Sequence, residues 1–150
     1  MLYSDSGVST IEFAIVFPFM IIIAFMGFEL AFDIIVDASV QIAAESASRV
    51  GVVVGTPPNG LTREQQATQI VHGILDGWTS VGGVVTVNIL DYAGYSNIGT
   101  PSYSANSPGG LGDIVSYNIT VTMPGLTGIP AWAHIPTLKF QRNFIVQNEK

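Results

Sequence analysis

The sequence lacks cysteine and is poor in positive charge. None of its 150 residues is a cysteine, so disulfides cannot stabilise the fold, and the folded part must be held together by packing. Only 5 Lys and Arg stand against 11 Asp and Glu, which gives a net charge of −6. No basic stripe is available to neutralise phosphates, so we expect no nucleic acid among the partners.

Recognisable catalytic and metal-binding patterns are also missing from the sequence. The two histidines, His72 and His134, are far apart, and there is no H-E-x-x-H motif. Residues 94–99 resemble a nucleophile elbow only superficially, because that motif needs a glycine two residues after its serine. We therefore predict a protein that is not an enzyme and that uses no cofactor and no metal.

What the sequence does have is a long uncharged run, residues 13–28, directly after Glu12. As a helix these sixteen residues would reach about 24 Å, slightly less than a hydrocarbon core of about 30 Å. Apolar character continues through residues 30–36, and no further glycine or proline follows until Gly51. The pattern predicts one helix over residues 11–50, about 60 Å long, in which Pro18 removes one backbone hydrogen bond.

Two simpler interpretations of the first 30 residues stay open at this point. An ordinary secretory signal would need small residues at an A-x-A-like cleavage site after the run, and these are missing. A plain uncleaved anchor needs no such site. Because all five cations lie beyond the run, charge alone does not fix the orientation of the helix in a membrane.

The stretch Gly7-Val-Ser-Thr-Ile-Glu12-Phe13 resembles the processing site of type IV pilins, whose leader ends in glycine and whose mature fifth residue is glutamate. Together with Pro18, it resembles the head of the TadE-like minor pilins of tight-adherence (Flp-type) pili. Residues 112–117 and 140–149 resemble the last strands of that family. The seven-residue leader has no cation, which departs from the usual pilin leader and which a start further upstream would explain.

The resemblance implies cleavage between Gly7 and Val8 by a prepilin peptidase, which would leave Glu12 as the fifth residue beside a new α-amine. It implies processing and assembly roles for Gly7, Val8, Glu12 and Phe13. It divides the chain into a leader (1–7), a transmembrane and stalk helix (8–51) and an extracytoplasmic α+β domain (52–150).

The same resemblance implies a minor pilin (pseudopilin) that crosses the bacterial inner membrane once, with its distal domain outside and with association with a pilus at the cell surface. The partners that it implies are the prepilin peptidase, other major and minor pilins, the inner-membrane assembly platform and membrane lipid. The alternative is an uncleaved, membrane-anchored periplasmic binding or secretion-accessory protein.

Acidic residues recur every four positions after the uncharged run, at Glu29, Asp33 and Asp37. On a helix this spacing makes a narrow seam, and neighbouring acids repel by a few tenths of a kcal/mol per pair, about 0.2–0.5 kcal/mol. The seam is either a solvated strip or a contact surface for basic groups on adjacent pilins or assembly proteins. Under the second interpretation, changing all three to Gln weakens assembly without unfolding the distal domain.

The rest of the chain predicts a small α+β domain. Thr62 and Gln65 fit a capping box at the start of a second helix. Residues 84–90, 114–123 and 138–146 alternate as strands, with Arg142 on the apolar side of the last one, where it would mark a sheet end or a bulge. We expect an antiparallel sheet of about three strands, backed by one helix and by the tip of the long helix.

Two connecting segments are candidate partner surfaces. Residues 92–111 are rich in Gly, Ser and Asn and carry Tyr92, Tyr95 and Tyr103, so they form either a contact surface or an ordinary flexible loop. Residues 124–136 are apolar for a loop. They either cover an end of the sheet or touch a partner or membrane, and Trp132 is the first residue to test there.

Overall fold

The computed structural model describes residues 6–52, 57 and 60–149. Its dominant element is α1, Ser6–Val52, an unbroken helix of 47 residues that is about 70 Å long. The remaining helical elements are α2 (Arg63–Leu75), the 3-10 helices η2 (Asp76–Val81) and η3 (Tyr95–Asn97), and the short α3 (Ile129–Trp132). The strands are β1 (Val84–Tyr92), β2 (Ser104–Ala105), β3 (Ile114–Met123) and β4 (Leu138–Gln147).

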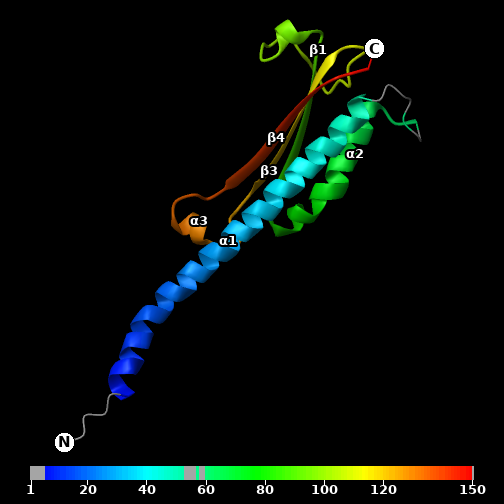
Figure 1. The fold of residues 1–150 in the computed structure, drawn as a ribbon. Coiled ribbons are helices and arrows are strands. Elements are labelled where there is room, and N and C mark those ends of the chain that lie inside the picture. The colour runs from blue at the N-terminus through cyan, green and yellow to red at the C-terminus, as the bar shows by residue number, and fades with distance from the viewer. Residues whose placement is uncertain (1–5, 53–56, 58–59, 150) are drawn as a thin grey trace, which may run out of the picture.

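The four strands form one antiparallel sheet in the order β2-β1-β3-β4. Figure 1 shows the sheet lying against the C-terminal half of α1, called the distal half below. The N-terminal half, called the proximal half, extends away from the sheet. The α+β fold class is therefore confirmed, with a long apolar N-terminal helix and a small domain behind it. The two-residue edge strand β2 is an addition, because the sequence predicted no strand within residues 92–111.

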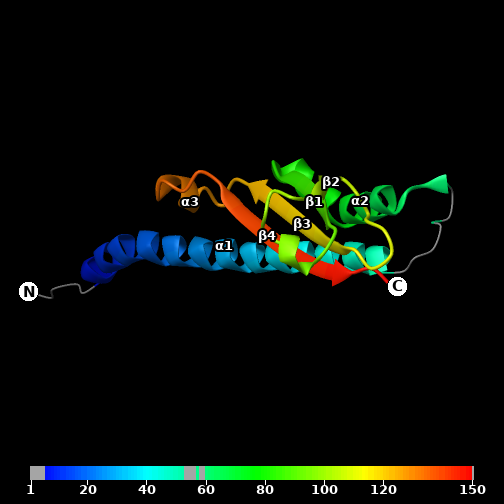
Figure 2. The ribbon, with the colours of Figure 1, turned by 90° about the horizontal axis from the view of Figure 1, so that it is seen from above.

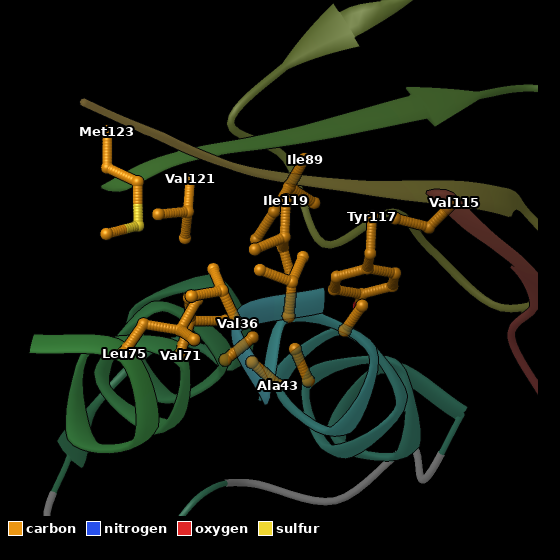
Figure 3. Close-up of a cluster of buried hydrophobic side chains, with 14 residues drawn as sticks. Val36, Ala43, Val71, Leu75, Ile89, Val115, Tyr117, Ile119, Val121 and Met123 are labelled. Carbon is orange, nitrogen blue, oxygen red and sulfur yellow. The ribbon is translucent and has the colours of Figure 1, made fainter. Parts of the chain in front are cut away.

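The core lies between one face of the sheet and two helices, α1 and α2, as Figures 2 and 3 show. From α1 the buried side chains are small and return every three or four residues, which keeps them on one face. The contributors from the three elements are Val36, Val40, Ala43, Ala44 and Ala47 of α1, Ala67, Val71 and Leu75 of α2, and Ile89, Val115, Tyr117, Ile119, Val121 and Met123 of the sheet.

The second helix begins as the sequence predicted. The Thr62 side chain accepts a hydrogen bond from the Gln65 N–H at 3.2 Å, and the Gln65 side chain accepts one from the Thr62 N–H at 3.0 Å. The capping box is thus confirmed, and it fixes where the chain enters α2. The stretch that precedes it, residues 55–60, is rich in glycine and proline, which predicts a turn, but residues 55, 56, 58 and 59 lie outside the described residues.

Tyr117 joins the end of α1 to the centre of the sheet. Its side chain is fully buried, and burial raises the pKa of its phenol, an effect that nearby Arg63 opposes. A Cβ added to Gly51 would lie 1.9 Å from the Tyr117 hydroxyl oxygen. Arg63 also donates to the Gly51 carbonyl at 3.2 Å and to the Gly109 carbonyl, so α1, α2 and a loop meet at one point.

The prediction that Arg142 marks a sheet end or a bulge was wrong. Strand β4 pairs with β3 in unbroken register along its whole length, and Arg142 lies opposite Ile119 near the middle. Its guanidinium forms an ion pair with the Asp37 carboxylate of α1. A cation is tolerated on this face because the helix packed against it supplies the matching charge.

Candidate functional site

Helix α1 has two halves with different surroundings. Every residue described from Thr10 to Phe28 is exposed, and these include large apolar side chains on all sides of the helix. Within the described part of the chain, α1 is the one helix long and apolar enough to cross a membrane. The domain covers only the distal half, so the exposed half is available to lipid or to other helices.

The predicted processing residues lie at the start of this exposed half. Gly7 and Val8 belong to the first turns of α1, while residues 1–5 of the predicted leader lie outside the described residues. Glu12 is exposed, and its carboxylate has no hydrogen-bond or ion-pair partner among the residues that the structure describes. The Phe13 ring stacks on Phe17 with centroids 5.1 Å apart. The structure leaves the roles of all four residues as predictions.

Glu29, at the boundary between the two halves, is the most buried acid in the described chain, at 6% exposure. Its Oε1 accepts the Leu126 N–H at 3.0 Å, and its Oε2 accepts the Thr127 N–H at 2.7 Å and the Thr127 hydroxyl. Gly125 permits this approach, because a Cβ there would lie 2.8 Å from Glu29 Oε1. The carboxylate therefore fastens the β3–β4 connection to α1 through charge-assisted hydrogen bonds.

The acidic seam is thus largely used within the chain. Glu29 binds the loop and Asp37 binds Arg142, whereas Asp33 is half-exposed and has no such partner among the described residues. Changing all three to Gln should now loosen the domain as well, which corrects the expectation of an effect on assembly alone. As a contact surface for other subunits, the seam stays a prediction.

The predicted aromatic surface is not continuous. Tyr92 is buried and makes an edge contact with Tyr103 at a centroid distance of 6.0 Å. Tyr95 is exposed, and its hydroxyl lies 3.5 Å from Gln147 Oε1. These tyrosines belong to the far end of the domain, whereas Trp132 belongs to α3, beside the middle of α1 (Figure 1). The structure therefore separates the four aromatic residues into two regions, and their partner roles stay predictions.

Sequence reasoning missed two contacts that fasten the domain to α1, namely Glu29 with residues 126 and 127, and Asp37 with Arg142. A signal for the second was present, since an arginine on an apolar strand face requires an acid from a packed element. The first had no signal, because its donors are backbone N–H groups of a loop. Every residue except proline has a backbone N–H, so the residue types of the loop do not reveal this contact.

The structure defines an architecture: one apolar N-terminal helix that fits a single membrane crossing, and a small α+β domain built on the same helix. Residues 7–49 match the family model described as TadE-like protein, which confirms the resemblance found in the sequence. That family is one of structural, pilus-associated proteins. The match covers most of α1. No curated protein and no solved structure matches the chain.

Proposed function

We propose that the chain is a minor pilin, or pseudopilin, that is cleaved after Gly7 and that enters or supports the assembly of a tight-adherence pilus. The observation that carries this proposal is the family match, which begins at Gly7 and runs along α1. Its segment includes Glu12 and the exposed half of the helix. An apolar helix that is exposed on all sides needs its surface shielded from water, by lipid before assembly and by neighbouring helices in a fibre.

Cleavage would create a cation next to the one acid of the exposed half. A free α-amine on Val8 has a reference pKa of about 7.7–8.0 and is therefore largely protonated at pH 7. Within one subunit this amine is the i, i+4 neighbour of Glu12. Between subunits, the same pairing neutralises two charges as helices leave lipid for the fibre. It is selective, because an unpaired buried charge costs several kcal/mol.

This proposal places the protein in the bacterial inner membrane, with the N-terminus cytoplasmic and the domain outside. Its partners are the prepilin peptidase, the other pilins and the assembly platform. The alternative is an uncleaved anchor for a periplasmic binding or secretion-accessory protein, in which Glu12 is an interfacial residue. Cleavage separates these two proposals.

The first experiment is the intact mass and N-terminal sequence of the protein, purified from membranes of hosts with and without a prepilin peptidase. We expect Val8 as the first residue only when the peptidase is present, because Gly7 ends the leader. A chain that keeps residues 1–7 in both hosts contradicts the pilin proposal and favours the uncleaved anchor.

The second experiment is Glu12→Gln, which removes the charge and keeps the shape. We expect normal membrane insertion and cleavage but a lower amount of the variant in sheared pili, because the Val8 amine loses its ionic partner. Glu64→Gln, in the first turn of α2, is the control for loss of a carboxylate elsewhere. Equal incorporation of both variants would reject the proposed role of Glu12.

A further inference from the structure

The connection between β3 and β4 is an exposed, uncharged loop. Residues 124–137 contain no Asp, Glu, Lys or Arg, and residues 131–137 are all exposed. Trp132 at the end of α3 is 80% exposed and Ile135 is 50% exposed. A large aromatic ring left bare beside further apolar side chains marks a surface that is covered by something outside the domain.

This loop lies beside the exposed, N-terminal half of α1. One shallow apolar hollow is lined by Ile22 together with Ile129 and Trp132. A second, between Met26 and Pro130, is mostly apolar but also has Glu29 and Asp33 in its lining. In both ribbon views α3 sits beside the middle of α1, at the end of the domain that faces the N-terminus (Figures 1 and 2). The apolar surface of the helix and that of the loop are therefore continuous.

The depth of this contact follows from helix geometry. Ile22 lies six residues before the last residue of the uncharged run, Phe28, which is about 9 Å along the axis. The run itself is about 24 Å long, shorter than a hydrocarbon core of about 30 Å. If the run spans the membrane, Ile22 and Met26 are at bilayer depth, and the loop that contacts them is there too.

We propose that this loop, residues 124–137, is a second membrane contact, which lies in the interfacial layer of the phospholipid bilayer next to α1 with Trp132 as its anchor. Tryptophan is favoured at this level because its ring is apolar and its N–H is polar. The proposal rests on α1 spanning a membrane, and it requires neither cleavage nor assembly into a pilus.

The backbone of the loop is suited to such a position. Four consecutive N–H groups, those of residues 132–135, donate within the loop to the carbonyls of Gly128, Ile129, Ala131 and Pro130 at 2.8–3.1 Å. Pro130 and Pro136 have no N–H to satisfy. In a bilayer, backbone polar groups must find partners inside the protein, and here most of the exposed segment has them. Glu29 satisfies two more N–H groups, those of Leu126 and Thr127.

Charge also favours the bilayer interface as the occupant of this surface. The first charged residue after the loop is Lys139, which is exposed at the start of β4 and would lie near lipid phosphates. A basic partner protein would find no carboxylate on the loop itself, and the hollow beside the loop offers it one half-exposed carboxylate, that of Asp33. Lipid offers what the surface requires, which is an apolar layer bordered by anionic groups.

The test uses the emission of Trp132 in the full-length chain, placed in phosphatidylcholine nanodiscs with one chain per disc. The sequence has two tryptophans, so Trp78→Phe leaves Trp132 as the single fluorophore. We expect its emission to shift to shorter wavelength on transfer into nanodiscs. We also expect it to lose most of its intensity when the upper part of the acyl chains is brominated, because bromine quenches on contact.

The control places a tryptophan at the far end of the domain by Tyr103→Trp in a chain that also carries Trp78→Phe and Trp132→Phe. Its emission should be the same in brominated and unbrominated lipid. If Trp78→Phe does not fold, the difference between the native chain and Trp132→Phe gives the same signal.

Two results would overturn the proposal. One is a Trp132 emission that is indifferent to bromine, which would mean that the loop stays in water or is kept for a protein partner. The other is quenching or burial that appears only with two chains in a disc, which would assign the surface to a second copy. Neither result depends on peptidase or pili, so failure here is distinguishable from failure of the pilin proposal.

Discussion

The two halves of α1 are both apolar, yet the chain covers only the distal half, and covers it on one face, since Leu30, Ile34 and Ile42 stay exposed. In the distal half the buried side chains are small and lie on one face, for example Ala43, Ala44 and Ala47. In the proximal half, large Phe, Ile and Met side chains surround the whole helix and all are exposed. Small residues on one face allow a sheet to approach closely, whereas large residues on every face suit lipid or a ring of helices. Side-chain size and distribution, and not apolarity, therefore tell which half has its neighbours within the chain.

The largest expected effect is a loss of stability on replacing Glu29, compared with no such loss on replacing Glu12 of the same helix. Glu29→Ala leaves the N–H groups of Leu126 and Thr127 without their acceptor, and we expect a loss of about 3 kcal/mol in the stability of the β3–β4 connection. Hydrogen exchange of these two amides in detergent should accelerate accordingly. Glu12→Ala, which removes an exposed carboxylate from the other half, is the control and should leave both rates unchanged. Equal effects of the two variants would show that Glu29 does not hold the loop.

An intermediate effect is expected from two glycines, one in each half. Gly51→Ala places a methyl group on the Tyr117 hydroxyl, and we expect it to destabilise the domain by about 2 kcal/mol through overpacking. At Gly27 an added Cβ meets nothing within 4 Å, so Gly27→Ala should be neutral or stabilise the helix by about 0.5–1 kcal/mol. Thermal unfolding in detergent, followed by near-UV circular dichroism, measures both.

A rescue experiment checks the cause of the Gly51 effect. Tyr117→Phe removes the hydroxyl that the added methyl group meets, so the double variant Gly51→Ala/Tyr117→Phe should regain part of the lost stability relative to the sum of the single changes. Strict additivity would mean that the contact between the two residues is not the reason for the loss.

The smallest expected effect concerns the ion pair between Asp37 and Arg142. Both side chains are about a third exposed, so the pair is partly screened by solvent and we expect a coupling of about 0.5–1 kcal/mol. A double-mutant cycle with Asp37→Asn and Arg142→Gln, repeated at high salt, measures it. A coupling indistinguishable from zero at low salt would leave Arg142 without a role in fastening β4 to α1.

Much of the fold could be predicted because its signals are local. Alternation defined the three long strands, the capping box defined the start of α2, and the long apolar pattern defined α1. The short strand β2 had no such pattern, because two residues at a sheet edge are too few to alternate. Arg142 was misread because a cation on an apolar face is explained only by its partner on another element.

In the candidate site, only the processing residues have a local signal in the sequence, and their roles stay predictions. Gly7 and Glu12 have a spacing that can be read directly, and the family match begins at the first of them. The use of Glu29 could not be read, since its partners are backbone groups almost 100 residues away in sequence. Contacts of this kind depend on the loop path, which no local pattern specifies.

Because α1 continues without a break from one half to the other, it fixes the orientation of the domain about the helix axis relative to the exposed half. A helix turns by about 100° and rises by 1.5 Å per residue, so one residue inserted between Phe28 and Glu29 would rotate the whole domain by about 100° around the axis of α1. Trp132 would then lie beside a different side of the exposed N-terminal half. The number of residues in the helix therefore determines the direction in which the domain points, and only insertions close to a whole number of turns would preserve that direction.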